Sequence, residues 1–309
     1  SKCLEAGTLV QTDAGVRRIE SFGEETPEPD EFVEVEEDVT IDGVQVESQY
    51  YAGDEDATRV RADNGTEIVG ATHSHRVLTP DGWQILGELE PGDQVVGRHV
   101  ESHGSGGAVV SFDAGVRSVH EKDASVPTEM SPRLARFLGM YAADGSVVDS
   151  RYSVEISTSS ERVRAEVVEL FEELFGCDPF VEADTRGGDE RDTVYNVGVN
   201  AKLVWEFVTE LCGSGSYEKS VPHEVLVGSP EEKIAFAEGI TLDGYVTEQS
   251  LVVYGGMSQQ LADGVAELLR SFGVPKVYVG RKWVEESDAY SYQVHVTNDA
   301  QELVTPVEP

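Results

Sequence analysis

The feature that most constrains the fold is an internal repeat in the second half of the chain. The segment LARFLGMYAADGSV (134–147) returns as KIAFAEGITLDGYV (233–246), and both contain an Asp-Gly pair near their ends. An amphipathic segment that ends in Phe-Gly follows each of them, 32 residues after Asp144 and 30 residues after Asp243. Two such units in tandem predict a pair of structural repeats related by a pseudo-twofold axis, which is stronger evidence than either motif alone.

This repeat resembles the LAGLIDADG homing endonucleases in their two-repeat, single-chain form, which commonly interrupt inteins. The resemblance implies an α+β fold in which two helices with small side chains, such as Gly139, approach closely. It also implies that Asp144 and Asp243 converge as catalytic residues and metal ligands. Two converging carboxylates suit Mg²⁺, which can activate water for phosphodiester hydrolysis. The expected partner is double-stranded DNA, and the strands after each helix would face it.

Two lysines are candidates for stabilising charge at the scissile phosphate. Lys219 lies ahead of the second motif, where the family often has a lysine followed by a proline, and Lys282 is the weaker candidate for the corresponding place in the second unit. The alternative for both lysines is a solvated surface charge with no role in catalysis. The second helix is expected to be one residue short or differently packed, because Gly239 precedes its aspartate by four residues where Gly139 precedes Asp144 by five.

Residues 1–112 predict a compact, curled β-domain. Runs typical of strands include GTLVQT (7–12), EFVEVEE (31–37), TRVRA (58–62), RVLT (76–79) and DQVVGRHV (93–100). Asp-Gly at 42–43 and 81–82 and Asn-Gly at 64–65 separate such runs, as they do in β-hairpins. No helical period of useful length occurs in this region, so short strands with tight turns are the expected architecture.

A cysteine near the start and a histidine motif further along give this β-domain a candidate chemistry. The two stretches are CLEAGTLVQT (3–12) and THSHRVLT (72–79), and LGELEPGDQVV (86–96) follows them. In this order and spacing they resemble the first two splicing motifs of inteins. The resemblance implies a Hint, or horseshoe-like, splicing domain that cuts and joins its own chain.

The intein resemblance assigns a role to Cys3, Thr72 and His75. The Cys3 thiolate, a strong nucleophile, would attack the carbonyl of Lys2 and replace the amide by a thioester. His75 would deliver a proton to the departing amide nitrogen, and Thr72 would hold or strain the scissile amide. His73 competes for this role, since two residues apart on one strand would share a face, but the motif register favours His75. The bland alternative for Thr72 and His75 is a strand end that satisfies local backbone groups.

The expected organisation is a splicing region (1–112), a linker (113–127) and an endonuclease-like region with repeats at about 128–230 and 231–309. Ser1 and Lys2 are expected to be remnants of the upstream flanking segment or of a tag. The chain ends QELVTPVEP, without the asparagine that closes a splicing domain. The expected partners are therefore the flanking host segments and a C-terminal splicing segment absent from this chain. A monomer is expected, and splicing itself needs no cofactor.

The charge balance indicates a protein adapted to high salt. The chain has 59 acidic against 23 basic residues, a net charge of −36. Such self-repulsion opposes compaction in ordinary salt, but the Debye length falls to about 3 Å at 1 M. A cytoplasmic protein of a halophilic archaeon is expected, since there is also no signal-peptide core and no apolar run long enough to span a membrane. Three distant cysteines suggest neither a disulfide framework nor a zinc site.

Two other functions remain open from the sequence. The first is a stand-alone LAGLIDADG-type DNA-binding protein or nuclease whose β-domain is unrelated to inteins and performs no peptide chemistry. The second is a non-splicing relative of the same β-fold, as in the autoprocessing domains of secreted proteins. The endonuclease-like repeat and the lack of a secretory signal disfavour the second.

Overall fold

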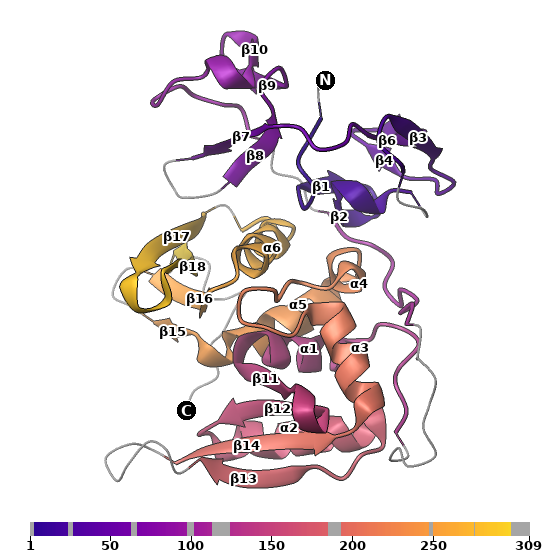
Figure 1. Ribbon diagram of the computed structural model, residues 1–309, viewed down its shortest axis with the longest axis vertical. Coiled ribbons are helices and arrows are strands. Elements are labelled where there is room, and N and C mark those ends of the chain that lie inside the picture. The colour runs from indigo at the N-terminus through magenta and orange to yellow at the C-terminus, as the bar shows by residue number, and fades with distance from the viewer. Residues whose placement is uncertain are drawn as a thin grey trace.

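The computed structural model describes residues 3–23, 27–62, 67–97, 102–112, 124–184, 193–246, 250–274 and 276–297 (Figure 1). In these ranges the first half contains strands and two short 3-10 turns, η1 (Ile19–Ser21) and η2 (Leu86–Glu88). The second half alternates helices with the strands of two larger sheets. Within the same ranges, no helix is both long and apolar enough to cross a membrane.

Within the described residues, the strands of the first half pair in five separate two-stranded antiparallel sheets, β1–β2, β3–β6, β4–β5, β7–β8 and β9–β10. Their bounds are β1 (Leu9–Thr12), β2 (Gly15–Arg18), β3 (Glu31–Glu34), β4 (Thr40–Ile41), β5 (Val44–Gln45), β6 (Ser48–Tyr51), β7 (Ala57–Arg61), β8 (Glu67–Thr72), β9 (Arg76–Thr79) and β10 (Gly82–Ile85). The β-rich character predicted for this region is therefore observed, as a set of small hairpins.

Turn chemistry explains two of these hairpins, β4–β5 and β9–β10. Asp42 (φ 54°) and Gly43 (φ 76°) both adopt left-handed backbone between β4 and β5, as a two-residue hairpin requires. Gly82 (φ 110°), the glycine of the predicted Asp-Gly turn, likewise has positive φ and is the first residue of β10. The Asn-Gly pair at 64–65 lies outside the described residues. The strand predicted at 93–100 is wrong for its described part: residues 93–97 form no strand, and Val96 N–H donates to Leu78 O without a ladder around it.

Four helices of the second half begin in the same way, which makes the repeat visible. The helices are α1 (Pro132–Asp144), α2 (Glu161–Phe175), α5 (Pro230–Ile240) and α6 (Gln259–Arg270). Each follows a serine whose hydroxyl accepts the backbone N–H of the third helical residue: Ser131, Ser160, Ser229 and Ser258. Proline fills the first position of α1 and α5, where its missing N–H costs nothing.

The two repeats also share one sheet topology. The first sheet has the order β11-β12-β14-β13 and the second the order β15-β16-β18-β17. The bounds are β11 (Gly145–Val148), β12 (Ser153–Thr158), β13 (Phe180–Asp184), β14 (Val194–Asn200), β15 (Tyr245–Val246), β16 (Ser250–Gly256), β17 (Val277–Val284) and β18 (Ala289–Thr297). Helices α3 (Lys202–Cys212) and α4 (His223–Leu226) follow the first sheet and complete the first repeat. The predicted pair of α+β repeats is confirmed.

One large core serves the second half, and the first half has only small clusters. Among the described residues, the buried clusters of the first half are Phe22 with Val35 and Val39, and Ala71 with Leu86. The large cluster contains the inner faces of both repeats and also takes Val16 and Val110 from the first half. The fold is therefore held together chiefly by the second half.

The segment that joins the halves packs on the second one. Of the predicted linker, residues 113–123 lie outside the described residues, and 124–127 have no regular structure. On either side of it, Val110 N–H donates to Thr128 O and Met130 N–H donates to Ala108 O. The Phe112 ring meets Phe207 edge-on at 5.5 Å between centroids. Residues 102–112 thus follow the surface of the second half.

Candidate functional sites at Cys3 and at the paired helices

The Cys3 segment is held against the end of β8 by backbone pairing. Glu5 N–H donates to Gly70 O (2.6 Å) and Thr72 N–H donates to Cys3 O (2.9 Å), with Leu4 and Ala71 paired between them. Cys3 is partly exposed, whereas Thr72 is buried. This short antiparallel ladder fixes the backbone of the predicted nucleophile.

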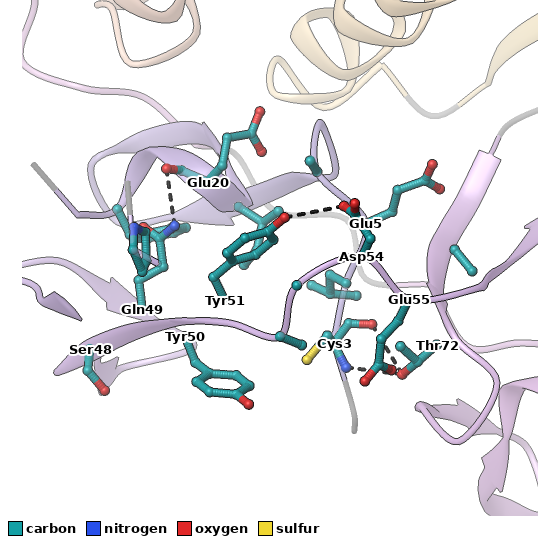
Figure 2. Close-up of a pocket in the computed structure, with 18 of the residues that line it drawn as sticks. Cys3, Glu5, Glu20, Ser48, Gln49, Tyr50, Tyr51, Asp54, Glu55 and Thr72 are labelled. Carbon is teal, nitrogen blue, oxygen red and sulfur yellow. Dashed lines mark hydrogen bonds between the residues drawn. The ribbon is translucent and has the colours of Figure 1, made fainter. Parts of the chain in front are cut away.

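The Thr72 side chain reaches the backbone nitrogen of Cys3. Its Oγ1 accepts Cys3 N–H at 3.1 Å and lies 3.5 Å from Cys3 O (Figure 2). Cys3 N is the amide nitrogen that would leave in an attack by the Cys3 thiol on the preceding carbonyl. The structure therefore brings the predicted pair Cys3 and Thr72 together at the atom on which the chemistry depends.

The two histidines follow Thr72 in a turn rather than on a strand. His75 N–H donates to Thr72 O (2.9 Å), and His75 O accepts Leu86 N–H (2.7 Å). His73 is exposed, and its ring packs so closely on Gly87 that a methyl group there would overlap it. Because β8 ends at Thr72, the assumption that both histidines share a strand face is wrong. The transfer of a proton by His75 remains a prediction.

A cavity of about 670 Å³ opens beside Cys3. Its lining includes the carboxylates Glu5, Glu20, Asp54 and Glu55 and the rings of Tyr50 and Tyr51 (Figure 2). Glu5 is paired with Arg59. A hydrogen bond to Asp30 raises the pKa of Tyr50, with smaller contributions from burial and from the charges of Asp30, Cys3 and Glu55. The charge of Asp54 raises the pKa of Tyr51.

Sequence patterns did not predict this lining. Strand β6, which carries Tyr50 and Tyr51, is absent from the runs expected from the sequence, because SQYY does not alternate apolar and polar residues. The sequence signal that could have indicated this lining is the tyrosine pair 50–51 shortly before the acidic segment 54–56.

Helices α1 and α5 cross at two glycines. A methyl group at Gly139 would lie 2.3 Å from Phe236 O, and one at Gly239 would lie 2.4 Å from Arg136 O. Such distances exclude any side chain, so the predicted need for small residues holds at this crossing. Helix α5 ends at Ile240 and continues as a 3-10 turn, η5 (Thr241–Asp243), where α1 stays helical to Asp144. The second helix is therefore shorter, as its glycine spacing predicts.

The two predicted acidic residues end equivalent helical segments. Asp144 is the last residue of α1 and is partly exposed, and Asp243 is the last residue of η5, with its side chain outside those described. No cluster of three or more metal-ligating side chains occurs among those described. Mg²⁺ usually takes one or two carboxylates and fills the rest of its shell with water and substrate phosphates. The pair Asp144 and Asp243 fits that donor set.

Lys219 lies beneath the end of α1. It is 6% exposed, and its Nζ donates to Tyr141 O (2.7 Å), Gly145 O (2.7 Å) and Ala142 O (3.3 Å). Burial lowers the pKa of Lys219 to about 8, while the charges of Cys212 and Asp144 raise it. A positive group at a helix C-terminus satisfies carbonyls that have no partner within the helix. The alternative of a solvated surface charge is therefore wrong for Lys219.

Lys282 does not occupy the matching place. It is exposed on β17, the strand equivalent to β13, whereas Lys219 follows α3. Its backbone oxygen accepts the Ser291 hydroxyl at 3.2 Å. A surface charge is the better interpretation of Lys282.

Comparison with known proteins identifies a family within the second half. Residues 131–212 match the family described as LAGLIDADG-like domain. This part of the chain, the first repeat, therefore carries a LAGLIDADG-like domain, and the predicted resemblance is confirmed for it.

Two curated proteins and several solved structures are similar to the chain. A protein of Pyrococcus abyssi, the A subunit of its A-type ATP synthase, is 27% identical over 304 residues, which are 88% of this chain and 28% of that protein. A DNA polymerase of Thermococcus hydrothermalis is 25% identical over 179 residues, 55% of this chain and 10% of that protein. The chain thus spans about a quarter or less of these relatives. The structure of I-DmoI in complex with DNA and Ca is 18% identical, with a TM-score of 0.41 over 56% of this chain and 86% of that one.

Proposed function

We propose that the chain is intein sequence, with a homing endonuclease inserted in its splicing domain. The observation that carries the proposal is the contact of the Thr72 hydroxyl with Cys3 N. In the proposed step the Cys3 thiol loses its proton to water, Cys3 Sγ bonds to the carbonyl carbon of residue 2, the bond from that carbon to Cys3 N breaks, and the nitrogen gains a proton from His75. The Thr72 hydroxyl holds the nitrogen in place while its bond breaks.

The relatives favour an inserted element over a host domain. The chain aligns with 28% of an ATP synthase protein and with 10% of a DNA polymerase. Those two proteins have different names and activities, and a segment shared by both fits an element inserted into unrelated hosts. The flanking host segments and a C-terminal splicing segment are the partners that this function requires.

The second proposed activity is cleavage of double-stranded DNA at the ends of α1 and η5. Asp144 and Asp243 would hold Mg²⁺ together with water and a phosphate oxygen. The metal ion would supply an activated water for attack on the phosphodiester. The exclusion of side chains at Gly139 and Gly239 supports this arrangement, because it brings the two segments that end in these aspartates together.

The acyl shift is tested with a reporter protein fused ahead of Ser1. Added thiol should release the reporter, and Cys3→Ala should abolish release. Thr72→Val, which keeps the shape of the side chain but removes its hydroxyl, should slow release by about tenfold or more, whereas Thr72→Ser should retain most of the rate. His75→Gln should slow release more than His73→Gln does.

The alternative of a stand-alone nuclease with an unrelated β-domain makes the opposite prediction. This alternative would be supported if added thiol failed to release the reporter, both from the chain alone and after addition of a C-terminal segment. The DNA substrate would be the parent gene without the segment that codes for this chain. Its magnesium-dependent cleavage should then still depend on Asp144 and Asp243. Release that persists in Cys3→Ala would refute the intein proposal.

A further inference from the structure

The first half depends on the second half for its stability. Its described strands form only two-stranded sheets, and its own buried clusters contain three and two residues. An isolated two-stranded hairpin is marginally stable in water and needs a helix or further strands to pack on. The hairpin β1–β2, which follows Cys3 most closely, finds that support outside its own half.

The hairpin β1–β2 lies directly on α4 and the large core. Val16 is fully buried in that core. At the tip, Gly15 has φ 103°, and a methyl group there would lie 2.6 Å from Val227 Cα. Backbone therefore meets backbone at this point, and no side chain fits between the hairpin and the residue after α4.

Polar contacts fix the orientation of the hairpin on the second half. Arg18 Nη2 donates to Val221 O at 2.7 Å, and Gln11 Nε2 donates to Glu267 Oε1 at 2.7 Å. Ser102 Oγ donates to Thr12 O at 2.8 Å, and the Lys233 ammonium donates to Ser102 O. Both strands of the hairpin are thus anchored to the second half or to the segment that covers it.

The turn η1, which follows the hairpin directly, is bonded to the Cys3 segment. Ile19 N–H donates to Thr8 O (2.8 Å), Gly7 N–H donates to Glu20 Oε2 (2.8 Å), and Thr8 N–H donates to Glu5 O (3.1 Å). Glu5 in turn pairs with Gly70 of β8. The segment that carries Cys3 is therefore bonded on one side to β8 and on the other to η1, the continuation of the hairpin.

We propose that the second half positions the backbone of the Cys3 site by packing against the β1–β2 hairpin. Gly15, Val16 and Arg18 are then positioning residues for the Cys3 backbone. The packing of the hairpin on α4 holds the Cys3 segment in register with Thr72. If that packing is lost, the segment can separate from β8, although Cys3, Thr72 and His75 remain in the chain. The consequence for the acyl shift rests on the proposed function, whereas the anchoring itself does not.

The test compares Gly15→Ala with Gly43→Ala in the full chain. Both glycines are at hairpin turns with positive φ, so both substitutions strain a turn, but only Gly15 faces a neighbour: nothing lies within 4 Å of a methyl group at Gly43. We expect hydrogen exchange of the Thr72 amide to accelerate by about tenfold or more in Gly15→Ala and to change little in Gly43→Ala. Amides of β14 report global unfolding and should be equally protected in both.

A second pair keeps the test decisive if Gly15→Ala does not fold. Arg18→Gln removes the guanidinium that binds Val221 O, and Arg18→Lys keeps a charged donor there. Thiol-induced release from the reporter fusion should slow by about tenfold in Arg18→Gln and recover in Arg18→Lys, with the same pH profile in all three proteins.

The two proposals fail in different ways. If the unsubstituted fusion shows no thiol-induced release, either alone or after addition of a C-terminal splicing segment, the proposed function fails, and exchange at Thr72 still reports the anchoring. If Gly15→Ala and Gly43→Ala exchange Thr72 equally, or Arg18→Gln exchanges it as slowly as the unsubstituted chain, the inference is overturned.

Discussion

Replacing Lys219 by methionine tests whether its ammonium caps α1. The new side chain would keep a flexible stem of similar length but leave three carbonyls of the α1 terminus without their donor. Two contacts of 2.7 Å to a charged donor contribute about 2 kcal/mol each and the one of 3.3 Å about 1 kcal/mol. Against this loss of about 5 kcal/mol, the variant no longer buries a charge, which costs about 3 kcal/mol for a pKa lowered from 10.5 to about 8. The net expectation at pH 7 is a destabilisation of about 2 kcal/mol.

The pH dependence gives the sharper test. The pKa of Lys219 is lower in the folded chain than in the unfolded one, so between pH 8 and 10.5 the unfolded chain binds more protons and stability rises with pH. From pH 7 to pH 9 this linkage adds about 1.4 kcal/mol to the unsubstituted chain only. The free-energy loss in Lys219→Met should therefore grow from about 2 kcal/mol at pH 7 to about 3 kcal/mol at pH 9.

The assay is urea unfolding followed by tryptophan fluorescence at pH 7, 8 and 9. Lys233, whose pKa burial lowers to about 8, contributes equally to both proteins. Burial raises the pKa of Cys212 to about 12, although the charge of Lys219 lowers it, so the thiol stays protonated up to pH 9 in both folded proteins and the comparison isolates Lys219. Lys202→Met is the matched control, since Lys202 forms a partly exposed pair with Glu206 along α3. A loss that is equal at pH 7 and pH 9, or no larger than the control, would refute the reasoning. Loss of DNA cleavage without loss of stability would return Lys219 to a role at the phosphate.

Two further predictions concern packing and charge. Gly139→Ala should destabilise the chain by about 2–4 kcal/mol in urea unfolding, because the added methyl group meets Phe236 O and Gly239 Cα; a gain in stability, as at an exposed helical glycine, would contradict the observed crossing. Raising KCl from 0.1 M to 2 M should raise the melting temperature by about 10 °C, because salt screens the net charge of −36; a melting temperature independent of KCl would remove the basis for a halophilic origin.

Periodic and repeated features were predictable from the sequence. The paired units were visible because each combines an Asp-Gly end with a later Phe-Gly end, and the first of these Phe-Gly ends is a helix cap that demands left-handed backbone at Gly176 (φ 65°). The length difference between α1 and α5 followed from the spacing of Gly139 and Gly239. Hairpins were predictable where Asp-Gly supplied positive φ.

Contacts between the halves were not predictable. The sequence VRR (16–18) would be the same whether the hairpin packed on the first half or, as observed, buried Val16 in the core of the second half. The same holds for Lys219, whose position in the sequence predicts a charge near DNA, while its burial under α1 depends on how α3 and the following loop fold back. The Thr72 contact with Cys3 N was predictable only through the motif, because 69 residues separate the two.

The packing of the β1–β2 hairpin on the second half has an evolutionary consequence. A deletion of the second half would leave the Val16 side chain in water and the Arg18 guanidinium without Val221 O. Such a deletion would therefore harm the first half at once, whereas a point mutation at Asp144 would not. On the proposed arrangement, a lineage can lose DNA cleavage and still be selected to keep the whole fold that once performed it.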